Sequence, residues 1–449
     1  MSTKTSEKVI CTVCGAVLDA SVRFCPVCGV GEEYFVPMSE DGGTAEKQAA
    51  AAETSPVVSA RRGSERFVIL GAGIAGIAAA EEIRRIHPTA SIVMVSEETA
   101  LPYYRTSLSK ERPVPQVNER FAMRSPEWYS TQGIFVLFGR RAVRVLTNQK
   151  QIELSDGEVL GYDKCIFATG ARSVVPPMEG RTLQGVFTLR SIADLEAMAR
   201  HMRPDMRAVV IGGGVLGLEV AWQLHRSGCH VTVLEAAEQL FPGRVAAVVA
   251  NHLVRLASLQ GIDIRTGVRV SRLEGEDYVR QVILPGEYLR AELVLLCCGS
   301  RPSVETAQEA GLEIDRGIVV NSRMMTGKYG VYACGDCAQI GQEVCGMWNT
   351  AETMGRCAGR NAAGEDAMYQ PCPTPLMMDA FGSHFFAAGD CGMSDKKYRI
   401  ERVGDADAGE GKYLYYSDGR LCGAVLVGDI SQASALLRQI EAGKVLETV

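Results

Sequence analysis

The stretch Arg66-Phe-Val-Ile-Leu-Gly71-Ala-Gly73-Ile-Ala-Gly76 decides the fold of this chain. Its apolar run predicts a buried parallel strand, and the helix-forming residues 77–85 follow directly. Gly71 allows a tight turn, Gly73 lets the backbone approach a pyrophosphate, and Gly76 lets the helix pack against its strand. The N-terminus of that helix then offers free N–H groups to phosphate oxygens.

An acidic residue completes this pattern. The next apolar run, residues 91–97, reads Ser-Ile-Val-Met-Val-Ser-Glu and ends at Glu97. A carboxylate at this place accepts a hydrogen bond from a ribose hydroxyl. Because strand, glycine turn, helix and acid are all in register, the stretch predicts a dinucleotide-binding unit rather than an ordinary strand–helix turn.

The same pattern occurs a second time. Residues 208–217 contain Gly212, Gly214 and Gly217, and the next predicted strand ends at Glu235. A carboxylate accepts a bond from a ribose 2′-hydroxyl but repels a 2′-phosphate, so we expect NADH to be preferred over NADPH, although Arg244 could soften this preference. Two such patterns predict two bound dinucleotides and two Rossmann-type domains, which is the plan of a flavoprotein reductase.

Length and charge narrow the possibilities. A chain of 449 residues is expected to form two to four domains. Its net charge of −6 and its pI of about 5.7 argue against nucleic acid or an anionic membrane as the partner. We find no apolar run long enough to span a membrane and no apolar core of a signal peptide, so we expect a soluble, cytoplasmic protein.

Four of the 15 cysteines lie close together near the N-terminus, in Cys11-Thr-Val-Cys14-Gly and Cys25-Pro-Val-Cys28-Gly. Two Cys-x-x-Cys-Gly knuckles supply four thiolates for one closed tetrahedral site, which suits zinc or iron. The spacing is typical of short zinc ribbons. The stretch also resembles rubredoxin, especially the short rubredoxin module of rubrerythrins, and this resemblance implies one redox-active iron centre with four cysteine ligands. A reductase on the same chain favours iron, because zinc does not change its oxidation state.

A further resemblance concerns residues 96–110, Ser-Glu-Glu-Thr-Ala-Leu-Pro-Tyr-Tyr-Arg-Thr-Ser-Leu-Ser-Lys. They resemble NADH:rubredoxin oxidoreductases, the ferredoxin reductases of oxygenase systems and apoptosis-inducing factor. The resemblance implies that Arg105 contacts FAD, and that Lys110 lies beside the isoalloxazine ring and pairs with Glu219 at the nicotinamide–flavin stack. Thr106 stands where these relatives usually have proline. The alternative is that Arg105 and Lys110 are surface cations with no role in cofactor binding.

Other segments resemble the same family. They are an Ala-Thr-Gly strand end, a Gly-x-Arg-Pro return strand, a second FAD fingerprint with Gly-Asp, and a Trp-x-x-Ala motif. The FAD- or NAD-binding residues that they imply are Thr169, Gly170, Gly299, Gly335, Asp336 and Trp348. Trp348 is either part of an electron exit or an ordinary buried aromatic, and Cys334 and Cys337 are either a redox pair or core thiols.

The absence of cysteines between residues 28 and 165 is informative. Disulfide reductases of this fold carry Cys-x4-Cys on the first helix after the ribose-binding acid, but no cysteine lies between Cys28 and Cys165 here. We therefore expect the flavin to release electrons to a metal protein or to oxygen rather than to a thiol.

These observations predict an α/β fold with the NAD domain inserted in the FAD domain. In residues 366–449 we expect strands at 376–380, 384–388, 397–402, 412–416 and 421–427 and a helix at 431–442. The predicted boundaries are 1–38 for the rubredoxin-like domain, 39–64 for a linker, 65–179 and 301–365 for the two parts of the FAD domain, 180–300 for the NAD domain, and 366–449 for a small α+β domain.

The resulting hypothesis is an NADH:rubredoxin-type oxidoreductase with FAD, in which electrons pass to the fused four-cysteine iron centre and on to an external acceptor. That acceptor would be a redox protein such as a rubredoxin-dependent peroxidase or an oxygen or superoxide reductase, and a homodimer is a possible assembly. Two alternatives remain: a flavin-dependent reductase or oxidase whose four-cysteine site is a zinc ribbon that binds a partner, and a non-enzymatic NADH-sensing scaffold.

Overall fold

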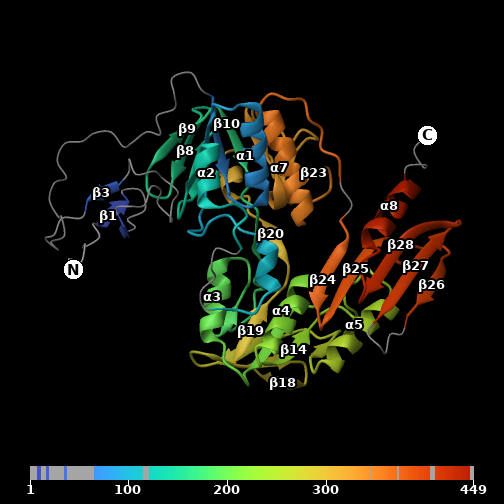
Figure 1. Cartoon of the computed structure of the whole chain (residues 1–449). Helices are drawn as coiled ribbons and strands as arrows, with labels where there is room; N and C mark the ends of the chain where they lie inside the picture. The colour runs from blue at the N-terminus through green and yellow to red at the C-terminus, as the bar shows by residue number, and fades with distance from the viewer. Residues whose placement is uncertain are drawn as a thin grey trace, which may run out of the picture. The chain divides into compact units, whose positions relative to one another are not determined.

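The computed structural model describes residues 65–114, 121–344, 346–371, 374–404 and 410–444, together with three short strands in the first 64 residues. The chain forms two compact units (Figure 1). The first unit comprises Met1–Tyr104, Phe121–Ala171 and Pro302–Gln370, and the second comprises Arg105–Arg120, Arg172–Arg301 and Pro371–Val449.

The three N-terminal strands form an antiparallel sheet in the order β2-β1-β3. They are β1 (Lys8–Cys11), β2 (Val17–Asp19) and β3 (Phe35–Pro37). Cys11 ends β1, whereas Cys14, Cys25 and Cys28 lie outside the described residues. The predicted four-cysteine site is therefore not among the parts that the structure describes.

The first unit is built on a parallel sheet in the order β22-β10-β4-β5-β6. Four consecutive residues of the central strand β4, Phe67 to Leu70, are buried, as expected for a parallel strand with both faces covered. The strands are β4 (Arg66–Leu70), β5 (Ser91–Val95), β6 (Ile134–Leu137), β10 (Lys164–Phe167) and β22 (Val331–Ala333).

Two helices of this unit, α1 (Ile74–Ile86) and α7 (Trp348–Ala362), lie side by side (Figure 1). Glycines make their close approach possible: a Cβ atom added to Gly355 would lie 2.2 Å from the carbonyl oxygen of Ala75, and one added to Gly359 would lie 2.4 Å from that of Ala79. The smaller elements of the unit are α2 (Pro126–Gln132), β7 (Ala142–Leu146), β8 (Gln151–Leu154), β9 (Val159–Gly161), α6 (Glu305–Glu309), β21 (Ile318–Val320), η4 (Gly335–Cys337) and β23 (Ala338–Ile340).

The second unit contains its own parallel sheet, in the order β12-β19-β13-β14-β15. Its strands are β12 (Val186–Phe187), β13 (Arg207–Ile211), β14 (His230–Leu234), β15 (Asp263–Arg265) and β19 (Leu293–Leu296). An antiparallel ribbon of β16 (Arg272–Gly275), β17 (Val279–Leu284) and β18 (Glu287–Arg290) also belongs to this unit. The helices and the short 3-10 segment are η2 (Arg105–Ser109), α3 (Ile192–His201), α4 (Val215–Arg226) and α5 (Ala247–Leu259). The chain passes between the two units through β11 (Ala171–Ser173) and β20 (Ser300–Pro302).

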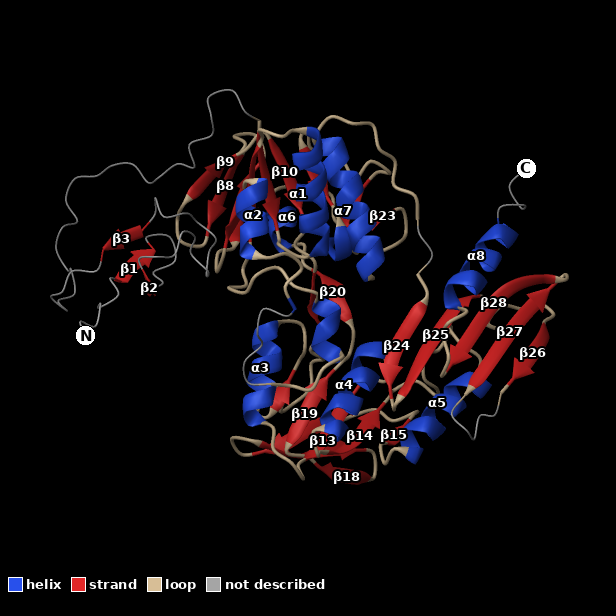
Figure 2. Cartoon of the chain, in the orientation of Figure 1, coloured by secondary structure: helices blue, strands red, loops and turns tan. Residues whose placement is uncertain are grey.

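The last part of the second unit is an antiparallel sheet in the order β24-β25-β28-β27-β26, with α8 packed against β25 and β28 (Figure 2). Phe386, Leu426, Leu436 and Ile440 form the apolar core between this sheet and α8. The elements predicted for this region are confirmed to within two residues at each end: β24 (Leu376–Ala380), β25 (Ser383–Gly389), β26 (Arg399–Val403), β27 (Gly411–Ser417), β28 (Arg420–Val427) and α8 (Ala433–Lys444). Among the described helices of both units, none is long and apolar enough to cross a membrane.

Candidate functional site

The first glycine turn lies between β4 and α1. Gly71 has φ +115°, and a Cβ atom added to it would lie 2.1 Å from the carbonyl oxygen of Ala168. A Cβ atom on Gly76 would lie 2.2 Å from the carbonyl oxygen of Gly71. A Cβ atom on Gly73, by contrast, would meet no heavy atom of the described residues within 4 Å. Packing within the protein therefore fixes the outer glycines, whereas the middle one faces open space.

The second glycine turn, between β13 and α4, has the same geometry. Gly212 has φ +116°, and its added Cβ would lie 2.3 Å from the carbonyl oxygen of Cys297. The Cβ on Gly217 would lie 2.0 Å from the carbonyl oxygen of Gly212, while the one on Gly214 would meet no described atom within 4 Å.

The helices that follow these turns begin without a side-chain cap. Gly73 and Gly214 are the N-cap residues of α1 and α4, two fully described helices whose first turns contain no acidic residue and whose caps make no side-chain hydrogen bond. Helix α3, in contrast, is closed by a capping box between Ser191 and Asp194. Helices α2, α5 and α7 also lack a side-chain cap, but only at α1 and α4 of these helices is the N-cap a glycine with open space beside it, and both turns therefore have room for the pyrophosphate of a dinucleotide.

The structure brings most of the predicted FAD residues of the first unit to this turn. Ala168, which packs against Gly71, is followed by Thr169 and Gly170, and the Thr169 hydroxyl donates to the carbonyl of Ser303 at 2.7 Å. A Cβ atom on Gly335 would lie 2.8 Å from the Cβ of Ala75 in the first turn of α1, so the Gly335-Asp336 pair also lies beside this helix end.

Two further predicted residues lie just after β5, which pairs with β4, and at the start of α7, which packs against α1. Glu97 is exposed and follows β5 by two residues. Trp348 begins α7, is partly buried against the core of the unit, and contacts the ring of Tyr104 with centroids 5.6 Å apart.

In the second unit, Glu235 is held beside the glycine turn by two backbone groups. The N–H of Gly213 donates to its carboxylate at 2.7 Å and the N–H of Ala237 at 2.8 Å. Two bonds fix the carboxylate and leave further lone pairs free to accept from a ribose. Arg244 instead donates to the carbonyl of Thr374 at 3.3 Å. Gly299, with φ +90°, is exposed three residues after β19.

The predicted ion pair between Lys110 and Glu219 is present. Lys110 Nζ lies 3.0 Å from Glu219 Oε1, and the Ser109 hydroxyl donates to the other carboxylate oxygen. Glu219 is only 3% exposed, so its charge needs these partners. The segment that carries Lys110, which the sequence placed in the FAD domain, makes its contacts within the second unit.

Asp379 and His384 also belong to this site, although the sequence did not predict them. Asp379 Oδ2 lies 2.6 Å from Lys110 Nζ, and the backbone N–H of Asp379 donates to Glu219 at 3.1 Å. His384 Nδ1 lies 2.5 Å from the other carboxylate oxygen, Asp379 Oδ1. Partial burial would raise the pKa of Asp379, but hydrogen bonds from Lys110 and His384 outweigh it and lower that pKa. Burial likewise opposes the charge of Lys110, yet Asp379 and Glu219 raise its pKa overall.

Arg105 has a hydrogen-bond partner within the protein. Its guanidinium donates to the carbonyl of Arg190, within the second unit. The FAD contact of Arg105 stays a prediction.

The cysteines of the two units are free thiols wherever the structure describes them. Burial raises the pKa of Cys297 and Cys391 to about 12 and that of Cys229 to about 11. Cys334 and Cys337 are fully buried, and burial raises both of their pKa values, so they are core thiols rather than a reactive pair. No cluster of three or more candidate metal ligands occurs among the described residues.

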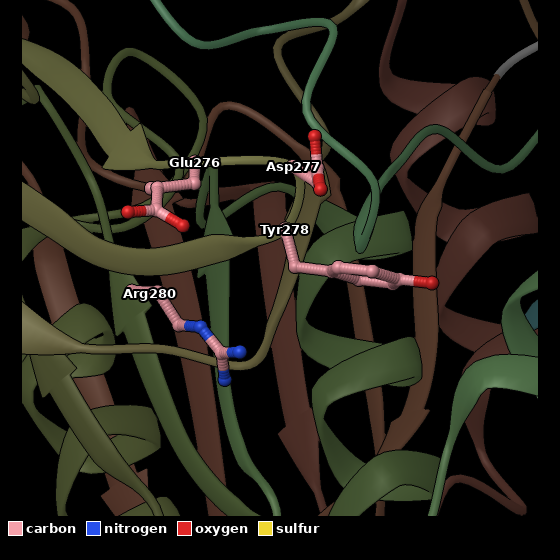
Figure 3. A pocket seen from close by; sticks show the side chains of 5 residues that line it. Glu276, Asp277, Tyr278 and Arg280 are labelled. Carbon is pink, nitrogen blue, oxygen red and sulfur yellow. The ribbon is translucent and has the colours of Figure 1, made fainter.

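An open pocket of about 400 Å³ lies at the turn between β16 and β17 (Figure 3). Gly275, Glu276, Asp277, Tyr278 and Arg280 line it, and Tyr278 also stacks on His201. Both acidic side chains are exposed, and neither glycine turn contributes to the lining. We therefore take the two glycine turns, and not this pocket, as the candidate dinucleotide-binding sites, one in each unit.

Comparisons with known proteins agree with this geometry. Residues 65–355 match the family model described as pyridine nucleotide-disulphide oxidoreductase. A rubredoxin-NAD(+) reductase of Pseudomonas putida is 34% identical over 275 residues, which cover 61% of this chain and 71% of the relative.

Two solved structures are similar in fold to this chain. The covalent putidaredoxin reductase–putidaredoxin complex matches with a TM-score of 0.75 and 28% identity, over 84% of this chain and 92% of that one. NADH:rubredoxin oxidoreductase from Clostridium acetobutylicum matches with a TM-score of 0.70 and 25% identity, over 84% and 95%. With its two open glycine turns, this chain therefore belongs to the pyridine nucleotide-disulphide oxidoreductase family and is an FAD-dependent NAD(P)H oxidoreductase of the ferredoxin and rubredoxin reductase type.

Proposed function

We propose that this protein is an NADH:rubredoxin-type oxidoreductase that delivers electrons to an iron ion held by its own Cys11, Cys14, Cys25 and Cys28, and from there to an external redox protein. The observation that carries the proposal is the combination, in one chain, of two open dinucleotide turns with four N-terminal thiolates spaced for a single ion. The relatives named for rubredoxin reduction support this direction of electron flow.

The residues of the first unit would hold FAD. Gly73 and the N-terminus of α1 would bind its pyrophosphate, Glu97 a ribose hydroxyl, and Asp336 the ribityl chain, with Thr169, Gly170, Gly335 and Trp348 around them. When bound, FAD supplies the conversion of a two-electron hydride donor into a source of single electrons.

The residues of the second unit would hold NADH. Gly214 and the N-terminus of α4 would bind the pyrophosphate, and Glu235 would accept from both ribose hydroxyls of the adenosine. A 2′-phosphate would face this carboxylate, which favours NADH over NADPH. Lys110, kept charged by Glu219 and Asp379, would favour the negative charge that develops on the reduced ring.

Four cysteine thiolates fit either iron or zinc, and the proposal requires iron. Among the described residues of the two units the thiols are free and mostly buried, so none of these thiols is a suitable acceptor of single electrons, which supports the four N-terminal cysteines in that role. The external acceptor would be a rubredoxin-dependent peroxidase or an oxygen or superoxide reductase, with the protein acting in the cytoplasm as a monomer or homodimer.

Metal content and electron transfer test this proposal together. Metal analysis of the full-length protein should find one iron per chain, and its oxidised form should show thiolate-to-iron absorption in addition to flavin absorption. Cys25→Ser should abolish NADH-dependent reduction of the acceptor while leaving NADH-dependent reduction of a dye intact. Cys422→Ser, which changes a partly exposed thiol of the C-terminal sheet, is the matched control and should leave both activities unchanged.

The alternative is a zinc ribbon that binds a partner, which the spacing of the two knuckles favours. One zinc per chain and no absorption beyond that of the flavin would establish this alternative and reject the iron relay, whether or not Cys25→Ser keeps its activity toward the acceptor.

A further inference from the structure

The ammonium of Lys110 is shared by two carboxylates that come from different parts of the second unit. Glu219 lies on α4, beside the dinucleotide turn, and Asp379 lies on β24 of the C-terminal sheet. The distances are 3.0 Å to Glu219 and 2.6 Å to Asp379, so the closer partner is the one that the sequence analysis did not identify. Glu219 is buried, whereas Asp379 has a side chain that is 45% exposed.

The C-terminal hairpin is also joined to Glu219 directly. The backbone N–H of Asp379 donates to the same carboxylate oxygen that accepts from Lys110. His384, on the neighbouring strand β25, binds the second oxygen of Asp379 at 2.5 Å. Asp379 and His384 face each other in the β24–β25 register, which fixes this contact.

A lysine on a flexible four-carbon stem is not held in one place by a single ion pair, because side-chain entropy opposes it. Two carboxylates on separate rigid elements restrict the ammonium much more tightly. We propose that Asp379 and His384 are positioning residues for Lys110: Asp379 completes the site of the ammonium, and His384 holds Asp379 in the conformation that does so. The role of Lys110 toward the flavin rests on the proposed function; the arrangement of the three side chains does not.

Lysine acetylation in the FAD-free protein tests the arrangement without any activity measurement. The rate of acetylation of Lys110 is measured by mass spectrometry against that of exposed Lys396. Asp379→Asn should speed acetylation of Lys110 about three- to tenfold, because a lost ion pair increases the fraction of free amine. Asp379→Glu should restore the slow rate. His384→Leu should also speed it, whereas His384→Asn, whose amide can replace the Nδ1–H donor, should not.

Two controls accompany this experiment. Asp366→Asn removes a carboxylate from another ion pair of similar length, with Arg323, and should leave Lys110 unchanged. If Asp379→Asn also leaves the acetylation rate of Lys110 unchanged, the inference is overturned.

Stopped-flow reduction of the loaded enzyme by NADH then tests the functional part. Asp379→Asn should slow flavin reduction at saturating NADH about fivefold with an unchanged KM. If Lys110→Met slows reduction and Asp379→Asn does not, the positioning role is rejected while the proposed function stands. If neither variant slows reduction, Lys110 has no role in flavin reduction. The acetylation rates alone then show whether Asp379 and His384 position the Lys110 ammonium.

Discussion

Gly73 and Gly76 are only three residues apart, yet a side chain would fit at Gly73 and would not fit at Gly76. Gly73 has φ −78° and ψ −175°, which alanine adopts freely, and its missing side chain faces open space. Gly76 is needed because a Cβ atom would collide with the backbone of Gly71. The fold therefore requires glycine at position 76 but not at position 73, where the predicted reason for glycine is the approach of a ligand.

Gly73→Ala should leave the FAD-free protein folded, with a free energy of unfolding within about 1 kcal/mol of the wild type. Its methyl group would occupy the place of the pyrophosphate and weaken FAD binding by about 100-fold, or ~2.7 kcal/mol. Gly76→Ala should instead destabilise the first unit by about 3 kcal/mol. Urea unfolding and FAD titration separate the two effects, and equal loss of stability in both variants would contradict this division.

Glu235 is the residue that should decide between NADH and NADPH. Glu235→Ala should raise the KM for NADH about tenfold and change the KM for NADPH little. Ala236→Arg, at an exposed position, should lower the KM for NADPH. Glu238→Ala, an exposed acid three residues later, is the matched control. An unchanged NADH preference in Glu235→Ala would mean that this acid does not read the ribose.

At the scale of elements, the contact of α1 with α7 depends on Gly355 and Gly359. These glycines bring the backbones of the two helices close together, so that α7 supports the helix whose N-terminus forms the first turn. This contact joins residues that are far apart in the sequence.

Gly359→Ala should lower the free energy of unfolding of the first unit by about 1–3 kcal/mol, because its Cβ would lie 2.4 Å from the carbonyl oxygen of Ala79. Gly327→Ala is the control: no described atom lies within 4 Å of its added Cβ, and stability should change by less than about 0.5 kcal/mol. Thermal unfolding of both FAD-free variants checks this, and similar midpoints would show that α1 and α7 tolerate a wider separation.

The C-terminal elements show what the sequence can and cannot predict. Strands β24 to β28 and α8 were predictable because alternation and helical periodicity are local patterns. The strand order was not, and neither was the contact of Lys110 with Asp379, which joins residues 269 positions apart. The glycine turns were predictable because each needs only a strand, a turn and a helix in succession. The four-cysteine site and the boundaries of the domains stay predictions.

At the scale of the whole molecule, the two dinucleotide turns belong to different compact units. Hydrogen–deuterium exchange should therefore show FAD protecting residues 70–78 and NAD⁺ protecting residues 211–219. In Gly73→Ala, the first protection should be lost at FAD concentrations that saturate the wild type, while the second is kept. Loss of both would show that binding at the two turns is coupled.

The near-identity of the two turns has a pharmacological consequence. Their φ angles of +115° and +116° and their equally open middle glycines give both turns the same backbone geometry at the predicted place of a diphosphate. A compound that imitates only that shared portion would compete with cofactor and substrate alike. Selective inhibitors of this enzyme would have to engage the parts of each ligand that lie beyond the diphosphate.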